Sequence, residues 1–361
     1  MPARYIPRPP RDLKHLPVKD WPEADRLAFD RAYVSGDIFD EDAGPGSHLA
    51  GGSRRMIQTA YRRWLGFIAR HHPNELGMSP NDRLNPVLVR SFVENLQSEV
   101  RSTTVAQTIR SLYAAAQIIA PGEDWGWLGA LGARLQDRSQ PLDRFERLVP
   151  PWETLDLGIE LMDQAKKRIA TLLGALQFRD GLIVALISAY PMRRRTFSAP
   201  TVATFEIDQA GISILLDPAD TKSKRHESAR LTDELVPYVR FYLAEVRPRF
   251  IRRGDHGGFW VSAKLGRLDP GRIYDIVRAR VFKKFGKLMS LHDFRRAAAT
   301  FVATHAPEKI GIIPGVLHHS SPEVSERWYI LARSVEAGRR HAAALAGMRA
   351  RLRASNLPDG S

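Results

Sequence analysis

The stretch that decides the fold lies between His292 and Tyr329 and reads HDFRRAAATFVATHAPEKIGIIPGVLHHSSPEVSERWY. It begins with His-Asp-Phe-Arg, continues to Leu317-His-His-Ser-Ser-Pro322 and ends on Trp-Tyr. No carboxylate cluster accompanies these residues. The chain instead offers cationic and proton-transferring side chains together with one phenol, namely Arg193, Lys222, His292, Arg295, His319 and Tyr329.

The charge balance of the whole chain indicates a polyanionic partner. Its 361 residues include 54 Lys and Arg against 40 Asp and Glu, which gives a net charge of +14. A surplus of this size favours nucleic acid as the partner. The length favours two domains and a tail over one small core.

Composition also excludes several classes of protein. The chain has no cysteine, so thiol catalysis, disulfides and cysteine-based zinc sites are excluded. Apolar runs such as Gly181–Ala189 fall short of the ~20 residues of a membrane span, so no spanning helix is expected. Residues 1–10 lack the apolar core of a signal peptide. We therefore expect a cytoplasmic protein associated with the nucleoid.

Breaks in composition predict the domain organisation. Residues 1–50, rich in proline and with an acidic patch at Asp37–Asp42, are expected to form a loosely packed N-terminal extension with one short helix around Ala24–Tyr33. Residues 51–140 are expected to form a helical domain. A linker at 141–151, a second domain at 152–345 and a tail at 346–361 follow.

Helical periodicity and capping signals define the first domain. From Ser53, apolar residues recur at helical spacing and arginines collect on the opposite side, which predicts a helix with a basic face. Asn85-Pro86 predicts the start of a second helix. Thr104 and Gln107 have the spacing of a capping box at the start of a third.

The second domain is expected to combine helices with a small antiparallel sheet. Two β-rich segments, 201–207 and 212–216, surround Asp208–Gly211 and predict a hairpin. Residues 235–250, 271–285 and 293–304 predict helices. The fold class is therefore mostly α with a small antiparallel β-sheet.

The site residues suit attack on a phosphodiester. This reaction needs a nucleophile, neutralisation of charge on the phosphate oxygens and a proton for the departing oxygen. Paired arginines can neutralise the phosphate, because each guanidinium offers two parallel donors. Arg295 lies three residues after His292, so both can face one anion from a single helix. A tyrosine, with a pKa near ~10, needs such cations nearby to act as a nucleophile.

These motifs, in this order, resemble those of the tyrosine recombinase (phage integrase) family. The first arginine motif of the family is similar to Pro191–Phe197, its His-x-x-Arg box to His292–Thr300, and its Leu-Gly-His-Ser-Ser-Pro stretch to Leu317–Pro322. Tyr329 matches the nucleophile. Lys222, just after the predicted hairpin, best matches the β-hairpin lysine, with Lys224 as the alternative.

The resemblance implies a helical core-binding domain followed by an α+β catalytic domain. It implies a site-specific recombinase or integrase that cleaves and rejoins DNA without metal, ATP or another cofactor, for DNA integration in a mobile element. The implied partners are double-stranded DNA and further copies of the chain in a synaptic tetramer. Arg193, His292 and Arg295 would grip the phosphate, Lys222 would protonate the leaving 5′ oxygen, His319 would assist, and Tyr329 would form a 3′-phosphotyrosyl bond.

Three positions depart from the family pattern. His318 replaces a glycine, so two adjacent histidines compete for one role, and His319 is preferred because Ser-Ser-Pro follows it directly. Thr196 replaces a common acidic residue, and Tyr329 stands one place later than is usual. Two alternatives therefore stay open, a non-catalytic DNA-binding protein with this fold and an enzyme resembling type IB topoisomerases. An Ala- and Arg-rich helix at Ala342–Leu352 either packs on a neighbouring protomer or frays.

Overall fold

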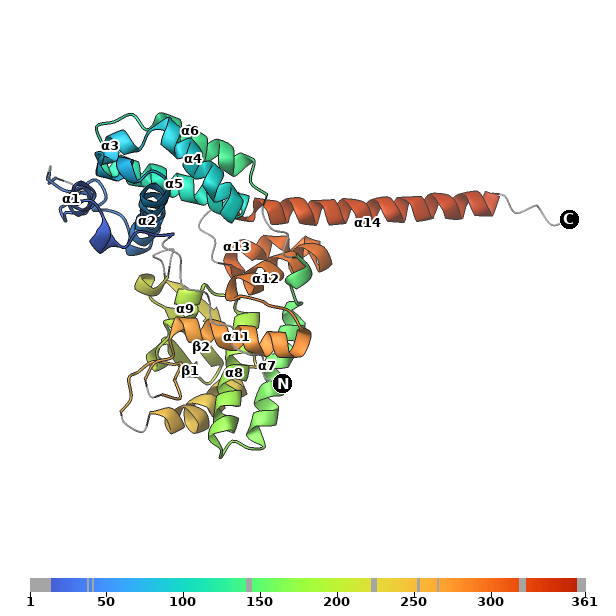
Figure 1. The fold of residues 1–361 in the computed structure, drawn as a ribbon. Coiled ribbons are helices and arrows are strands. Elements are labelled where there is room, and N and C mark those ends of the chain that lie inside the picture. Colours follow the sequence, from blue (N-terminus) through green and yellow to red (C-terminus); the bar gives the residue numbers. More distant parts are fainter. Residues whose placement is uncertain are drawn as a thin grey trace, which may run out of the picture. The chain divides into compact units, whose positions relative to one another are not determined.

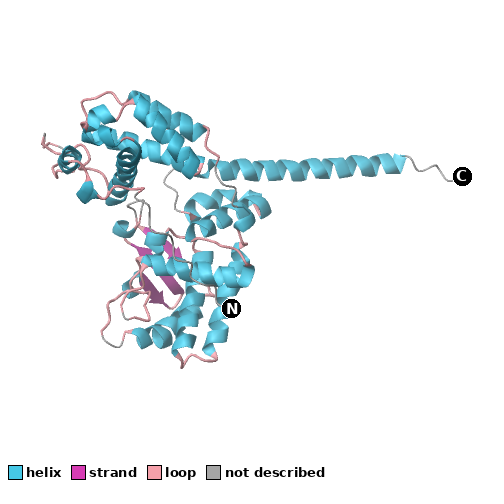
Figure 2. Cartoon of the chain, viewed as in Figure 1, coloured by secondary structure: helices cyan, strands magenta, loops and turns pink. Residues whose placement is uncertain are grey.

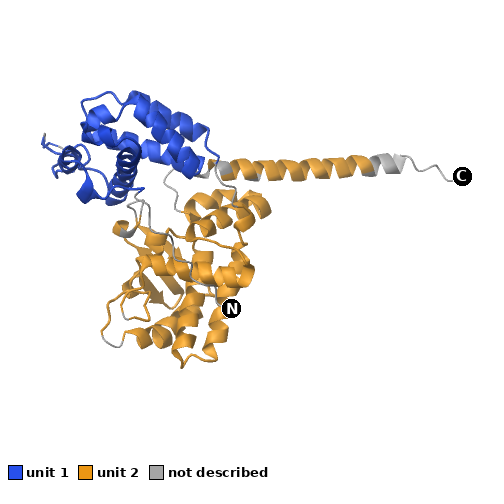
Figure 3. Cartoon of the chain, viewed as in Figure 1, with its two compact units in different colours: residues 1–143 blue, residues 144–361 orange. Residues whose placement is uncertain are grey.

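The computed structural model describes residues 14–37, 39–40, 42–140, 145–221, 226–251, 254–264, 266–317 and 323–355. The chain divides into two compact units, residues 1–143 and 144–361 (Figure 3). Each unit has its own hydrophobic core. The division between the units falls inside the predicted linker, residues 141–151.

Unit 1 is a helical bundle around a core rich in aromatic rings. Trp64 and Phe67 of its long helix pack against Phe92 of another, with ring centroids 5.2 Å apart in both pairs. The arginines of the long helix lie on its opposite face, as its periodicity predicts. Its helices are α1 (Glu23–Ala32), α2 (Gly51–His71), α3 (Pro80–Arg83), α4 (Pro86–Glu99), α5 (Ser102–Ile119) and α6 (Gly126–Asp137) (Figure 1).

One of the two predicted helix starts in unit 1 is confirmed. The Asn85 side chain accepts hydrogen bonds from the backbone N–H groups of Val87 and Leu88, and so caps α4. The capping box at Thr104 and Gln107 is wrong. Helix α5 begins at Ser102, so Thr104 already lies inside the first turn, and the Thr104 carbonyl accepts a bond from the Thr108 hydroxyl.

The prediction of a loosely packed N-terminal extension is wrong for residues 14–37, although its short helix is confirmed as α1. Trp21 and Phe29 are buried and pack edge-on or tilted against Tyr61. Asp25 of α1 forms a fully buried ion pair with Arg83 at 2.8 Å. Prolines and charged residues dominate the composition of this segment, which is why the sequence suggested loose packing. Its few aromatic rings nevertheless pack on the hydrophobic surface of α2.

Unit 2 combines helices with a three-stranded sheet, which confirms the predicted fold class (Figure 2). The described helices are α7 (Pro151–Lys166), α8 (Leu172–Ala189), α9 (Arg194–Ser198), α10 (Val236–Phe241), α11 (Pro270–Phe285), α12 (Leu291–His305), α13 (Ile313–Val316) and α14 (Glu323–Ser355). The described strands are β1 (Phe205–Asp208), β2 (Gly211–Leu216) and β3 (Glu227–Arg230).

The predicted hairpin is confirmed, and the sheet adds a strand that the sequence did not reveal. Strands β1 and β2 are antiparallel, with Asp208 opposite Gly211, whose φ of +142° suits glycine. Strand β3 pairs with the other edge of β2. The predicted helix at 235–250 is interrupted, because α10 is followed by a π-helical turn and a 3-10 turn around Pro248, which has no N–H to donate.

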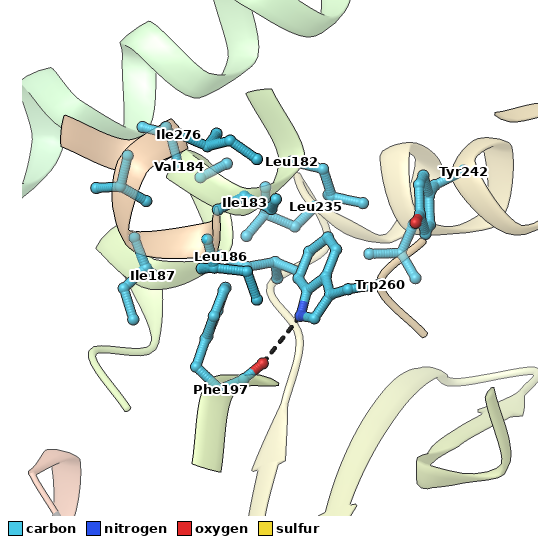
Figure 4. Close-up of a cluster of buried hydrophobic side chains, with 14 of the residues drawn as sticks. Leu182, Ile183, Val184, Leu186, Ile187, Phe197, Leu235, Tyr242, Trp260 and Ile276 are labelled. Carbon is cyan, nitrogen blue, oxygen red and sulfur yellow. Dashed lines mark hydrogen bonds between the residues drawn. The ribbon is translucent and has the colours of Figure 1, made fainter. Parts of the chain in front are cut away.

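Helix α8 is the central element of unit 2. Its side chains Leu182, Ile183 and Leu186 lie in the core with Trp260, whose indole N–H donates to the Phe197 carbonyl at 2.9 Å (Figure 4). By length and composition this helix could cross a membrane, so the expectation of no such helix is wrong on these two criteria, because it was based on uninterrupted apolar runs. However, 78% of its residues are buried inside the unit, as expected of a core helix.

Part of the predicted linker belongs to the core of unit 2. Residues 141–144 lie outside the described residues, but Leu148 and Val149 are buried in the same cluster as α8. The surrounding residues are mostly polar or proline, so the composition of the segment gave no sign that these two apolar residues belong to a core. At the other end, α14 runs without a break through the predicted boundary at 345/346, and residues 337–349 of this helix are exposed.

Candidate active site

Arg193 lies on the turn between α8 and α9, where its backbone forms the N-cap of α9. The turn is fixed by Tyr190. Its hydroxyl donates to the Arg230 carbonyl at 2.8 Å and accepts from the Thr232 N–H at 2.9 Å. The first arginine motif is thereby attached to the end of β3. Thr196, one of the three departures from the family pattern, is buried in α9.

Arg295 connects two motifs that are far apart in the sequence. Its side chain, buried in α12, donates to the Pro191 carbonyl at 2.6 Å and to the Leu317 carbonyl. Pro191 begins the first arginine motif, and Leu317 directly precedes the two histidines. One guanidinium therefore brings three of the predicted motifs to the same place.

Arg193 and Arg295 are close enough to repel each other. The pKa of Arg295 is lowered to about 10, first by burial and then by the positive charge of Arg193, while Glu227 of β3 opposes the shift. A bound anion would relieve this repulsion. Sequence reasoning missed Glu227, because it lies in a strand that was not predicted.

His292 occupies the first turn of α12, one helical turn before Arg295, and is exposed. Ser290 and Asp293 form a capping box at this end of the helix. Its Ser-x-x-Asp spacing is a helix-start signal that the sequence reasoning overlooked. The capping box therefore fixes the helix start that carries the imidazole.

Three predicted positions lie outside the described residues: Lys222, its alternative Lys224, and His319, as does His318. Their neighbours are described. Thr221 is buried, Glu227 acts on Arg295, and Leu317 is bound by Arg295. Glu227 and Leu317, which flank the undescribed residues, therefore lie close to Arg295. Within the described ranges no three His, Asp or Glu side chains are grouped to hold a metal ion.

Tyr329 lies on α14 and is half-buried. Its neighbour Trp328 packs in a small cluster with Ala299, Ile313 and Leu317, which attaches α14 to α12 and α13. Tyr329 itself lines a groove of about 540 Å³ beside the 3-10 turn Pro307–Ile312, together with Arg333. Among the described residues, no hydrogen bond joins its hydroxyl to Arg193, His292 or Arg295. The structure therefore brings the two arginines together and leaves the phenol in a groove of its own.

A second cationic region lies on unit 1, over α2 and α5. A groove of about 530 Å³ there contains no carboxylate among its lining residues. Arg55 and Gln107 are exposed in it, and Gln107 also lines a neighbouring groove of about 840 Å³ that includes Arg110. The lining residues of the smaller groove are His15, Arg55, Met56, Thr59, Ala60, Arg63, Thr103, Thr104, Gln107, Thr108 and Ser111.

No protein-family model and no curated protein matches the chain. Among solved structures, the chain is similar to the XerH site-specific recombinase bound to difH substrate in a pre-cleavage complex. The TM-score is 0.55 at 15% identity, over 80% of this chain and 78% of that chain. The chain has the tyrosine recombinase fold.

Two further solved structures match the chain with lower scores. XerA recombinase gives a TM-score of 0.39 at 15% identity, over 82% of this chain and 95% of that one. XerH bound to a palindromic difH substrate, in a post-cleavage complex, gives a TM-score of 0.46 at 12% identity, over 89% of this chain and 94% of that one. Within the tyrosine recombinase fold, the sequence motifs of this chain occupy α9, α12 and α14.

Proposed function

We propose that the protein is a site-specific DNA recombinase in which Tyr329 attacks a phosphodiester held by Arg193, His292 and Arg295. The tyrosine oxygen would form a bond to phosphorus, and the 5′ oxygen of the next nucleotide would leave with a proton. The product is a 3′-phosphotyrosyl bond, which a new 5′ hydroxyl reverses. Because the bond energy is retained in the intermediate, rejoining requires no ATP.

The observation that carries this proposal is the convergence on Arg295. Its guanidinium binds the backbone at Pro191 and Leu317 and lies beside the positive charge of Arg193. A buried cation next to a second cation is unfavourable; the carboxylate of Glu227 offsets part of this cost, and a bound phosphate would offset more of it. The similarity to XerH, itself described in complex with a difH substrate, agrees with this ligand.

The position of Tyr329 defines what else the reaction requires. Its hydroxyl must reach the phosphate, although in the free chain the residue lines the groove beside Pro307–Ile312. Either α14 shifts when DNA binds, or the tyrosine comes from a neighbouring copy in a synaptic tetramer. We assign Lys222 as the general acid, with Lys224 as the alternative, and His319 as the assisting residue.

DNA contacts outside the arginine pair would come from the groove over α2 and α5. It combines exposed Arg55 with hydroxyls and the Gln107 amide, and no carboxylate lines it; its second arginine, Arg63, pairs with Glu99. Arginines position a protein on phosphates, while an exposed amide can read a base edge. A cytoplasmic protein of a mobile element would use such a surface to select its site.

The test is covalent capture of DNA. Purified protein is incubated with fragmented genomic DNA, adducts that survive detergent are isolated, and the attached DNA is sequenced. We expect one enriched sequence for the wild type and no adduct for Tyr329→Phe, since phenylalanine lacks the attacking oxygen. Tyr274→Phe, in α11 of the same unit, is the matched control and should retain adduct formation. Equal adduct yields from wild type and Tyr329→Phe would refute the proposal.

The same material separates the two alternatives. Adducts spread over the DNA without enrichment, together with relaxation of plasmids that lack a specific site, would indicate a topoisomerase. Enriched binding without any adduct would indicate a non-catalytic DNA-binding protein.

A further inference from the structure

The segment that opens unit 2 packs along the helix that carries His292 and Arg295. Lys287 donates from its ammonium to the Leu148 carbonyl at 3.0 Å, and the Val149 N–H contacts the Met289 sulfur at 3.3 Å. Arg147 donates to the Leu288 carbonyl. Residues 147–149 therefore lie against the stretch that leads into α12.

The contacts continue to the far end of α12. Phe145 and Trp152 both pack against Phe301, with ring centroids 6.4 and 5.4 Å apart, and Trp152 also meets His305 at 5.5 Å. The segment 145–152 thus supports α12 from the residues before its first turn to its last.

At the first turn of α12, the support is an ion pair with a buried carboxylate. Asp293 is fully buried, and its Oδ2 accepts from the Ser290 N–H and hydroxyl, both at 2.8 Å. Its Oδ1 has no hydrogen-bond partner among the described residues. Arg147, with a side chain 42% exposed, places its Nη2 3.6 Å from Oδ2. A buried carboxylate is costly unless a cation compensates it, and Arg147 supplies that positive charge at this turn.

Asp293 directly follows His292 in the sequence. Arg295 is held independently by the Pro191 and Leu317 carbonyls, whereas His292 is exposed on the first turn itself. We propose that Arg147 is a positioning residue, which acts through Asp293 to fix the imidazole of His292 where it meets the scissile phosphate. This inference rests on the proposed recombinase function for its consequence in catalysis.

The variants are chosen to separate positioning from folding. Arg147→Gln removes the charge, and Arg147→Lys retains it. Asp293→Asn removes the partner charge and forms a double-mutant cycle with Arg147→Gln. The control is Arg272→Gln, which removes an exposed arginine of the same unit from its 3.5 Å pair with Asp275. Thermal unfolding of each variant reports its stability.

The first readout is the rate of adduct formation at saturating DNA, compared with the dissociation constant for DNA. We expect Arg147→Gln to lower the rate on the order of tenfold, because small misplacement of a reacting group is costly, with DNA affinity and melting temperature close to wild type. Arg147→Lys should recover most of the rate. In the Asp293→Asn background, Arg147→Gln should have little further effect. The inference would be overturned if the rate losses of Arg147→Gln and Asp293→Asn were additive in the double variant, or if Arg147→Gln lowered DNA affinity as much as it lowered the rate.

The second readout does not need activity. Histidine-ring NMR of the full chain, with the His292 signal identified by its loss in His292→Gln, reports the environment of the imidazole. Arg147→Gln should shift this signal and Arg272→Gln should not. An unmoved signal in Arg147→Gln overturns the positioning role even in an active recombinase. If Arg147→Gln shifts the signal but the wild-type protein never forms adducts, the positioning role is supported and the proposed recombinase function is refuted.

Discussion

Arg295 joins structure and chemistry in one side chain. Its N–H groups donate to the Pro191 and Leu317 carbonyls, and its positive charge lies beside that of Arg193, with Glu227 as an opposing charge. A lysine would keep the charge but not the planar fork that binds two carbonyls at once. The guanidinium shape is therefore as important at this position as its charge.

We expect Arg295→Lys to lower the rate of adduct formation by about 100-fold or more, because the substitution disturbs both the contact with the phosphate and the geometry of the motifs. Leaving one buried carbonyl unsatisfied should also cost about 1–3 kcal/mol of unfolding free energy. Single-turnover cleavage and urea unfolding measure the two effects. Arg296→Lys, at the adjacent half-buried position, is the control and should remain close to wild type in both. A stable and active Arg295→Lys would contradict this assignment.

Among the described elements of unit 2, α7 and α8 form the most extensive helix–helix contact. Gly158 of α7 and Gly181 of α8 face each other, so that a Cβ on Gly158 would meet the Ala185 nitrogen at 2.6 Å and the Gly181 carbonyl oxygen at 2.7 Å. These neighbours are backbone atoms and cannot rotate away. The absence of side chains at both glycines is what lets the helices approach.

Gly158→Ala should therefore destabilise the protein by about 1–3 kcal/mol, since the helices must separate to admit the methyl group. The matched control is Gly338→Ala on the exposed part of α14, where nothing lies within 4 Å of the added Cβ. There the same substitution should stabilise the helix by up to about 1 kcal/mol. Thermal and urea unfolding report both changes. The two substitutions should change the free energy of unfolding in opposite directions. A change in the same direction for both would argue against the close contact of α7 and α8.

At the scale of the whole molecule, the net charge of +14 is the main long-range property. Part of it lies in the groove over α2 and α5 of unit 1, where Arg55 is exposed and no carboxylate is among the lining residues, although Arg63 pairs with Glu99 at 3.1 Å. The groove on the α4–α6 side of the same unit includes Arg90 and Arg134 but also Glu94. The distribution of charge, beyond its sum, distinguishes the two surfaces.

DNA affinity should consequently fall steeply with salt, because each neutralised phosphate releases a counterion. Arg55→Gln should reduce the slope of log Kd against log salt concentration by about 1. Arg90→Gln, from the groove that contains Glu94, should leave the slope unchanged. Fluorescence anisotropy across a salt series measures both slopes. An unchanged slope in Arg55→Gln would remove the α2–α5 groove from the DNA interface.

Local signals in the sequence were sufficient for much of the fold. The Asn85 cap, the hairpin around Asp208–Gly211 and the short helix before Tyr33 are confirmed, because each depends on neighbours within a few residues. The capping box at Thr104 failed, since a helix can begin earlier when packing supports its first turn. Strand β3 was missed because it contains almost no apolar residue and exists only by pairing with β2.

The sequence by itself determined the order of the motifs, the cationic character and the fold class, since these depend on residue type and short spacing. The tertiary structure alone decided that Arg295 is buried between Pro191 and Leu317, and that Tyr329 lines a separate groove. It also decided that the N-terminal segment packs on α2 through Trp21 and Phe29, and is joined to α3 by the Asp25–Arg83 pair. The physical reason is that burial and charge pairing join residues tens to more than a hundred positions apart, which no local pattern encodes.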